Sequence, residues 1–272
     1  MKNRDNEYKL SRVVLGWQEF LRIPGTYEHH LRKNSDNKKL MKFCRIWRRV
    51  FKRLNLSPYR RNDLSVLEVG CGGGKYLVQF ALNNWRTVGI DCSKEVLNRA
   101  RNYIEEVSNS CQRNLDTELI CGDFMGFNFS EKFDLVFHSG VIEHYLDKDE
   151  RMSFLRKMFE ITKPGGYTVS IVPVTKGADK TNDIVDGCVP AINYTPDLMN
   201  QEFKNLNGGE IRIFTHNLFF YFLARREPII YSINKSLYYI LQMIPPDMFS
   251  SDFAYKNAGA LVGITKKQIC KL

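Results

Sequence analysis

The stretch Val66–Lys75, with the sequence VLEVGCGGGK, determines how the rest of the chain is interpreted. An apolar, strand-forming run ends at Gly70, and residues of helical character begin at Tyr76. The glycines between them let the backbone turn tightly and approach a ligand closely, and the N-terminus of the following helix offers free N–H groups. The stretch therefore predicts a strand, a ligand-binding turn and a helix.

The spacing of the glycines separates two classes of nucleotide cofactor. The dinucleotide fingerprint GxGxxG requires a glycine at position 75, where this chain has Lys75. The chain instead has the pattern Glu-x-Gly-x-Gly-x-Gly, formed by Glu68, Gly70, Gly72 and Gly74. This pattern resembles motif I of the class I S-adenosylmethionine-dependent methyltransferases.

Further motifs resemble those of the same family and follow in the family's order. They cover about residues 64–173 and are Gly89-Ile90-Asp91, Gly122-Asp123-Phe124, Phe133–Ser139, Val141-Ile142-Glu143-His144 and Lys163-Pro164-Gly165-Gly166. Several ordered motifs are much stronger evidence than one glycine turn. The resemblance therefore predicts an enzyme, a methyltransferase that uses S-adenosylmethionine.

The resemblance also implies which residues bind this cofactor. Asp91 lies 21 residues after Gly70 and is expected to accept hydrogens from the ribose hydroxyls. Asp123 is expected to bind the adenine amino group, and Phe124 to pack on the adenine ring. The full set expected to bind S-adenosylmethionine, or its product S-adenosylhomocysteine, is Glu68, Gly70, Cys71, Gly72, Gly74, Asp91, Cys92, Asp123, Phe124, His138 and Ser139.

After Leu64, short β-rich runs alternate with helical patterns, which predicts a parallel sheet covered by helices. The predicted strands are Ser65–Val69, Thr87–Ile90, Glu118–Cys121, Phe133–Phe137 and Tyr167–Val172. The predicted helices are Tyr76–Asn83, Lys94–Val107 with Ser93 as N-cap, and Lys148–Ile161. The fold class is thus a doubly wound α/β sheet, which the resemblance extends to seven strands, most of them parallel.

Two regions lie outside these motifs. Residues 1–63 are expected to form a basic helical segment, and residues 64–272 a methyltransferase domain with a polar, turn-rich cap insertion at about 174–214. Beyond the cap, the pattern predicts a helix, a strand, a helix and a strand, over Thr215–Arg226, Pro228–Ile233, Leu237–Met243 and Ala260–Thr265. The two strands are expected to complete the sheet as antiparallel elements.

Methyl transfer to a hydroxyl or amino group requires the acceptor to lose a proton, so a general base is useful. His144 follows the fourth predicted strand and is the best candidate, with a structural Glu143–His144 pair as the alternative.

The sequence also argues against some acceptors. Residues His138–Val141 read His-Ser-Gly-Val and not the Asn/Asp-Pro-Pro-Tyr that holds a planar amide or exocyclic amine, so methylation of amino-adenine or glutamine is not expected. No Pro-Cys pair exists for cytosine chemistry. A small molecule is therefore the predicted acceptor, with a lipid- or glycan-linked one among the options.

The net charge of +10 resides in the N-terminal part of the chain. Residues 1–64 contain 17 Lys and Arg against 6 Asp and Glu, and the remaining residues contain 23 against 24. Lys38–Leu54 is predicted to be one amphipathic helix with a basic face. That face is either solvated or a contact for a phosphorylated substrate, an anionic membrane or nucleic acid. Tyr27 and His29-His30, just before it, are candidate lid residues.

The longest stretches without a charged residue, Pro164–Thr175 and Ile213–Ala224, are 12 residues each, too short for a membrane span. There is no secretory signal at the N-terminus, so a cytoplasmic protein is expected. Seven scattered cysteines show no metal-ligand spacing, and no metal is expected.

Three alternative functions are left open. They are an RNA methyltransferase, a non-catalytic binding module that keeps the cofactor fold, and a nicotinamide-dependent oxidoreductase, which Lys75 disfavours.

Overall fold

The structure is a computed structural model that describes residues 12–30, 40–55, 64–174, 184–185, 190–218 and 251–269. The chain divides into two compact units, Met1–Lys132 and Phe133–Leu272, which are described in turn.

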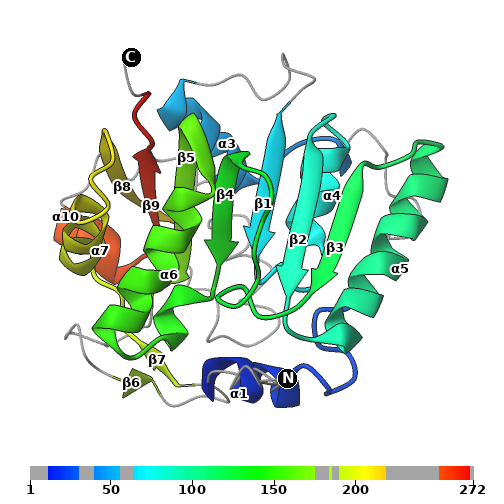
Figure 1. Cartoon of the computed structure of the whole chain (residues 1–272), viewed down its shortest axis with the longest axis horizontal. Coiled ribbons are helices and arrows are strands. Elements are labelled where there is room, and N and C mark those ends of the chain that lie inside the picture. Colours follow the sequence, from blue (N-terminus) through cyan, green and yellow to red (C-terminus); the bar gives the residue numbers. More distant parts are fainter. Residues whose placement is uncertain are drawn as a thin grey trace, which may run out of the picture. The chain divides into compact units, whose positions relative to one another are not determined.

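The first unit contains three parallel strands and four helices within its described residues (Figure 1). In chain order these are α1 (Arg12–Phe20), α3 (Arg45–Leu54), β1 (Ser65–Val69), α4 (Lys75–Ala81), β2 (Arg86–Asp91), α5 (Lys94–Cys111) and β3 (Thr117–Cys121). β2 pairs in parallel with β1 and with β3. Every residue of β1 is buried, as expected for a strand covered by helices on both faces. Ser93 caps α5 as predicted, since its hydroxyl accepts from the Val96 N–H at 3.3 Å.

The single helix predicted over Lys38–Leu54 is interrupted, because residues 41–44 are not helical and α3 begins at Arg45; Lys38 itself lies outside the described residues. The backbone just before α3 is instead hydrogen-bonded by two side chains in and just after α4, those of Gln79 and Asn83. Asn83 Nδ2 donates to the Met41 carbonyl at 2.8 Å, and the Cys44 N–H donates to Gln79 Oε1 at 2.9 Å. The helix has the amphipathic character that was predicted, because Trp47, Val50, Phe51 and Leu54 of the expected apolar stripe are buried, and Ile46 is buried with them.

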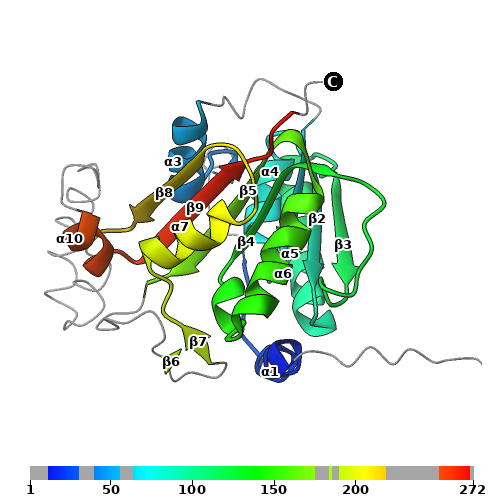
Figure 2. The same cartoon turned by 60° about the vertical axis from the view of Figure 1, so that its left-hand side comes forward.

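The second unit contains the remaining described elements. They are β4 (Phe133–Ser139), the 3-10 turn η1 (Ile142–His144), α6 (Lys148–Glu160), β5 (Thr162–Pro173), β6 (Ile184–Val185), β7 (Ala191–Ile192), α7 (Pro196–Lys204), β8 (Ile211–His216), α10 (Ser251–Lys256) and β9 (Ala260–Lys266). β4 and β5 pair in parallel, while β9 pairs antiparallel with both β5 and β8. Helix α7 packs on β8 and β9 (Figure 2).

The described strands form a seven-stranded sheet with the order β3-β2-β1-β4-β5-β9-β8, and a separate two-stranded sheet of β6 and β7. The predicted fold class, a doubly wound and mostly parallel seven-stranded sheet, is confirmed. The five predicted parallel strands and the final strand at Ala260–Thr265 are present.

The other antiparallel strand is not where the sequence placed it. It is β8, whereas the predicted strand Pro228–Ile233 and helix Leu237–Met243 lie outside the described residues. The helix predicted to start at Thr215 is wrong at its beginning, because Thr215 belongs to β8 and pairs with Leu261. The alternation of Ile211, Ile213 and Thr215 was a strand signal, but the aromatic run after it resembles a helix.

The expected cap insertion also contains more regular structure than its polar sequence indicated. Helix α7 starts at Pro196 behind the N-cap Thr195, whose hydroxyl accepts from the Leu198 N–H at 3.2 Å. Met199 and Phe203, four residues apart, give the helix its buried side. Such a short apolar stripe is easily missed in a polar segment.

Candidate active site

The glycine turn after β1 adopts backbone conformations that suit glycine. Gly70, Gly72 and Gly74 have φ angles of +69°, +52° and +75°, which residues with a side chain rarely adopt. The N–H groups of Gly70 and Cys71 donate to the Ile90 carbonyl at 2.8 and 3.2 Å. The turn is thus held against the carboxyl end of β2, the neighbouring strand.

Asp91, the last residue of β2, is bonded directly to this turn. Its Oδ2 accepts from the Gly72 N–H and its Oδ1 from the Ser93 N–H, both at 3.0 Å. The Gly122 N–H donates to the Asp91 carbonyl at 2.9 Å, which brings the end of β3 to the same place. Burial raises the pKa of Asp91, and the N–H groups that bond its carboxylate oppose that rise.

Glu68, within β1, is a second buried acid in this unit, with 2% of its surface exposed. Its Oε2 has no hydrogen-bond partner among the described residues. Burial and then the charge of Asp91 raise the pKa of Glu68 well above its usual range. An unpartnered buried carboxyl oxygen beside a second acid favours a ligand that carries positive charge.

Two predicted site cysteines are held as neutral thiols. The Cys71 Sγ–H donates to the Gly72 carbonyl at 4.0 Å, and the Cys92 Sγ–H donates to the Val14 carbonyl at 3.9 Å. Burial raises the pKa of both, that of Cys92 to about 12. These thiols can pack against a ligand but are poorly suited to act as nucleophiles.

The predicted adenine contacts follow β3. Asp123 Oδ1 accepts from the Met125 N–H at 3.0 Å, which shapes the turn, and Asp123 is half-buried. Phe124 is buried, with its ring centroid 6.0 Å from that of Phe129. The backbone of Gly122, rather than the Asp123 side chain, contacts Asp91.

The N-terminal segment covers the glycine turn. A Cβ atom added at Gly72 would lie 3.1 Å from the ring of Tyr27, and one added at Gly73 would lie 2.1 Å from the Tyr27 carbonyl oxygen and 2.6 Å from the His29 ring. These glycines are needed for the close approach of the two segments. The loop after α1 therefore lies directly on the turn, as a lid segment would.

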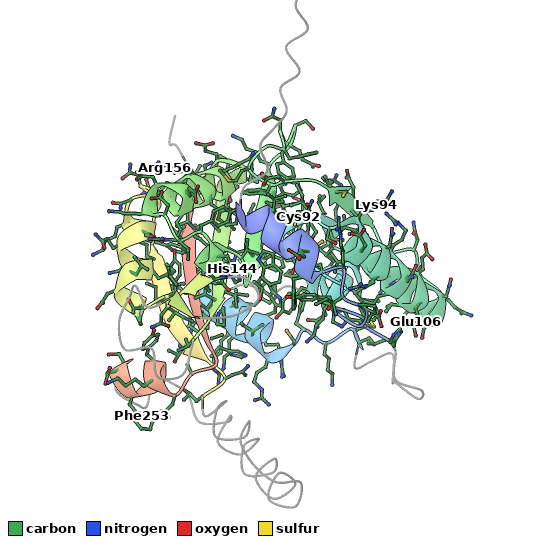
Figure 3. All side chains as sticks on the ribbon, turned by 90° about the horizontal axis from the view of Figure 1, so that it is seen from below. Cys92, Lys94, Glu106, His144, Arg156 and Phe253 are labelled. Atoms are coloured by element: carbon green, nitrogen blue, oxygen red, sulfur yellow. The ribbon has the colours of Figure 1, made fainter. Side chains whose placement is uncertain are left out.

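Side chains of the domain hold this segment in place. Arg99 on α5 donates to the carbonyls of Ile23, at 3.3 Å, and Thr26, and its Nε lies 3.9 Å from Glu28 Oε1. Gln18 Nε2 on α1 donates to the Cys92 carbonyl at 3.0 Å, and Figure 3 shows Cys92 beside this helix. Sequence reasoning missed Arg99 and Gln18, because their partners lie more than 70 residues away along the chain.

In the second unit, His144 lies at the end of η1, where its ring contacts the backbone at Pro190. Its Nδ1 lies 3.0 Å from the Pro190 carbonyl oxygen. A carbonyl can only accept, so Nδ1 carries the hydrogen and Nε2 has the lone pair. Nε2 lies 3.9 Å from Glu143 Oε1, and the His144 side chain is 11% exposed.

The residues around His144 are buried and neutral. Burial raises the pKa of Glu143 to about 8, so its carboxyl is mainly protonated at pH 7. Burial, with the nearby His144, lowers the pKa of His138 to about 3. The His138 ring packs edge-on against Phe154 at 5.5 Å, and neither of its nitrogens has a hydrogen-bond partner within the described part of the chain. Ser139 is half-buried at the end of β4.

Comparison with known proteins agrees with this geometry. Residues 66–166 match the family model described as a methyltransferase domain. This central region of the chain is a methyltransferase domain. The methyltransferase domain expected from the motifs is thus confirmed over residues 66–166, and the curated relatives that match this region are named as methyltransferases.

Individual relatives match this chain over its central region. A ubiquinone biosynthesis O-methyltransferase of Chelativorans is 33% identical over 103 residues, which are 38% of each chain. A probable methyltransferase, ltbC, of Aspergillus luteorubrus is 31% identical over 115 residues, which are 41% of this chain and 40% of that protein. The chain therefore spans about two fifths of the length of these curated relatives.

A solved structure of a methyltransferase extends the likeness beyond that region. A S-adenosylmethionine-dependent methyltransferase from Methanosarcina mazei aligns with 84% of this chain and 99% of its own, at a TM-score of 0.55 and 13% identity. This likeness shows a shared fold.

The described residues of the first unit fit S-adenosylmethionine. This cofactor carries positive charge, which matches the unpartnered Oε2 of the buried acid Glu68, and it carries ribose hydroxyls, which match the buried carboxylate of Asp91. The glycine turn leaves room for close approach of a ligand to the backbone.

The basic face of α3 contains Arg48 and Lys52 as exposed residues. None of the described helices is both long and apolar enough to pass through a bilayer.

Proposed function

We propose that the protein transfers a methyl group from S-adenosylmethionine to a hydroxyl or amino group of a small molecule. The observation that carries this proposal is the buried acid pair at the glycine turn, where Asp91 bonds the Gly72 N–H and Glu68 keeps an unpartnered oxygen. When bound, the cofactor supplies a methyl group that its positively charged sulfur already activates for displacement. The protein then has to orient the reactants and exclude water.

The cofactor-binding residues divide this task. Asp91 accepts hydrogens from ribose hydroxyls, and Glu68 provides the carboxyl that pairs with the positively charged amino acid end. The turn at Gly70, Gly72 and Gly74 lets the cofactor approach the backbone closely. Asp123 and Phe124 hold the adenine, and the remaining proposed cofactor contacts are Cys71, Cys92, His138 and Ser139.

His144 is the proposed general base. Its Nδ1–H donates to the Pro190 carbonyl, so Nε2 takes the proton that the acceptor hydroxyl or ammonium loses. An ionised Glu143 beside it would favour the protonated ring before the reaction. Since burial raises the pKa of Glu143 to about 8, this carboxyl is mainly protonated at pH 7 and does not act on the ring in that way.

The acceptor class rests on the relatives. Two of the matched proteins are a ubiquinone biosynthesis O-methyltransferase and a probable methyltransferase of a fungus, and the first name favours a hydroxyl acceptor. A lipid-linked acceptor would agree with the basic N-terminal segment, residues 1–63, resting on an anionic membrane. The cap insertion, residues 174–214, is the proposed acceptor-binding element.

The first experiment is a calorimetric titration of the full chain with S-adenosylmethionine, S-adenosylhomocysteine and NAD in turn. Binding of both sulfur nucleotides with a micromolar Kd, and no heat from NAD, is expected. Binding of NAD alone would overturn the proposal in favour of an oxidoreductase. Loss of both sulfur nucleotides in Asp91→Ala, with retention in Glu131→Gln at the exposed ion pair with Arg86, would place the site.

The basic segment requires its own test. Sedimentation with vesicles containing anionic lipid, at low and at physiological salt, is expected to show salt-sensitive binding. Lys52→Glu should weaken it, while Lys256→Glu on α10 should not. Binding to RNA with no vesicle binding would instead favour the RNA methyltransferase.

A further inference from the structure

His144 is oriented by a backbone group from a distant segment. The Pro190 carbonyl that fixes the imidazole lies 46 residues further along the chain, just before β7. Pro190 itself is exposed, so its own side chain does not hold that carbonyl in place. The position of the proposed base therefore depends on whatever holds residues 190–195.

A buried charged pair provides that hold. Arg151 on α6 and Glu202 on α7 are 5% and 0% exposed, and Arg151 Nε donates to Glu202 Oε1 at 2.9 Å. The other carboxylate oxygen of Glu202 accepts from the hydroxyl of Tyr194, which is 1% exposed. Tyr194 lies four residues after Pro190, in the segment that leads into α7.

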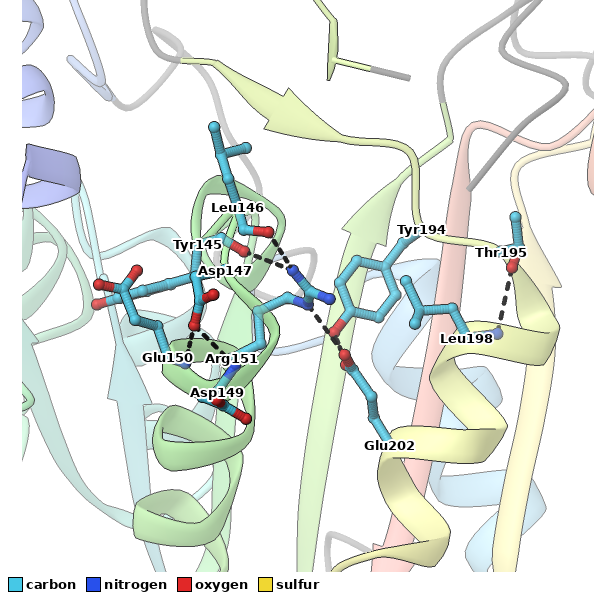
Figure 4. Close-up of polar contacts among 10 residues, drawn as sticks. All are labelled: Tyr145, Leu146, Asp147, Asp149, Glu150, Arg151, Tyr194, Thr195, Leu198 and Glu202. Atoms are coloured by element: carbon cyan, nitrogen blue, oxygen red, sulfur yellow. Dashed lines mark hydrogen bonds and ion pairs between the residues drawn. The ribbon is translucent and has the colours of Figure 1, made fainter. Parts of the chain in front are cut away.

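The opposite end of Arg151 binds the segment that carries His144. Its Nη1 donates to the carbonyls of Tyr145 and Leu146 at 3.0 and 2.7 Å. These are the two residues that follow His144. Figure 4 shows the guanidinium between these carbonyls on one side and Glu202 with Tyr194 on the other.

A further hydrogen bond supports the same segment from α10. The Tyr255 hydroxyl contacts the Tyr194 carbonyl at 3.1 Å and Asn193 Oδ1 at 3.3 Å. Asn193 is 1% exposed, and β7 packs against η1. The segment from Asn193 to Tyr194 is thus held by side chains of α7 and α10, and Arg151 on α6 bonds the α7 residue Glu202.

We propose that Arg151, Glu202 and Tyr194 form a positioning network that sets the distance between Pro190 and His144, and so selects the Nδ1–H tautomer of the base. The inference rests on the proposed function, in which His144 takes a proton. The Arg151 guanidinium links the two partners of the Nδ1–carbonyl hydrogen bond. It bonds the residues after His144 directly, and it bonds the segment after Pro190 through Glu202 and Tyr194. A buried pair of this kind is costly to desolvate and is a poor source of stability alone, whereas it fixes geometry well. The network acts on the acceptor step and leaves cofactor binding unchanged.

Tyr194→Phe is the clearest test, because it removes one hydroxyl and keeps the shape of the side chain. Thr162→Val is the matched control. Thr162 is fully buried in the same unit, and its hydroxyl donates to the Met158 carbonyl at 2.8 Å, away from the residues of the network. Both variants lose one buried hydroxyl and are expected to lower Tm by similar amounts.

The direct readout is the tautomer of His144, measured by nitrogen-15 spectra of the imidazoles. The chain has five histidines, and His144→Gln identifies the signal. In the native protein and in Thr162→Val we expect the Nδ1–H form, which is the minor tautomer of a free histidine. Tyr194→Phe should give a mixture, and Arg151→Lys, which cannot bond Glu202 and both carbonyls together, a larger change.

Kinetics supply the second readout. Tyr194→Phe should lower kcat by ~10-fold or more through displacement of the base, with the Kd for S-adenosylmethionine unchanged. An unchanged tautomer together with a kcat equal to that of Thr162→Val would overturn the network. Failure of the native protein to bind S-adenosylmethionine would instead overturn the proposed function, and the tautomer measurement would still decide the network.

Discussion

The Gly72 N–H donates to Asp91 Oδ2 at 3.0 Å, so one hydrogen bond joins the glycine turn after β1 to the acid that ends β2. Two motifs that lie 19 residues apart along the chain thus become one site. The carboxyl ends of parallel neighbouring strands meet at the same edge of a sheet, and ligands of doubly wound sheets bind at that edge.

Replacement of Asp91 should weaken cofactor binding more than it weakens the fold. In Asp91→Ala the ribose hydroxyls lose a charged acceptor, and we expect a loss of about 1–3 kcal/mol in binding, or roughly 5- to 150-fold in Kd. Calorimetry with S-adenosylhomocysteine measures this directly. Glu131→Gln, which removes an exposed ion pair, is the control and should bind normally. Equal affinity of both variants would exclude Asp91 from the site.

The contact of the N-terminal segment with the glycine turn can be tested at Gly73. A Cβ there would lie 2.1 Å from the Tyr27 carbonyl oxygen, so Gly73→Ala should push the loop of Tyr27 and His29 off the turn. We expect faster proteolysis within residues 21–30 and faster release of S-adenosylmethionine. Gly122→Ala is the control, because its Cβ would lie 4.0 Å from the nearest atom, on Phe127. Equal cleavage rates for the two variants would contradict a closed lid.

The motif region was predictable because its signals are local. The strand before Gly70, the N-cap Ser93 and the acid at Asp91 each follow from residues close in sequence. In contrast, the Pro190 carbonyl on His144 and the Arg99 contacts to the N-terminal loop join distant segments through backbone atoms. A carbonyl is present in every residue, so no residue type in the sequence indicates such a contact.

Removal of the proposed base should reduce turnover selectively. His144→Gln should lower kcat by about 10²- to 10⁴-fold, the usual contribution of a general base, with the Kd for S-adenosylmethionine unchanged. His30→Gln is the control, since its ring is exposed on the N-terminal loop. Steady-state rates with a responsive acceptor measure the effect. Equal kcat values for the two variants would leave His144 with the structural role that its bond to Pro190 already gives it.

The buried carboxyl of Glu143 makes a signed prediction for stability against pH. Its pKa rises from 4.5 in the unfolded chain to about 8 in the folded protein. Between these values the folded state binds more protons than the unfolded state, so Glu143 stabilises the fold fully below pH 4.5 and loses this contribution as the pH rises through 8.

Glu143→Gln removes that dependence while keeping the shape of the side chain. We expect the free energy of unfolding of the native protein to fall relative to the variant as the pH rises from 6.5 to 8, by up to about 1.4 kcal/mol per pH unit. His138, with a folded pKa of about 3 against 6.5, acts in the opposite direction, but it is present in both proteins and cancels in the comparison. Urea unfolding at pH 6.5, 7.25 and 8 therefore isolates Glu143. Parallel stability curves for the two proteins would mean that Glu143 is ionised in the fold at neutral pH.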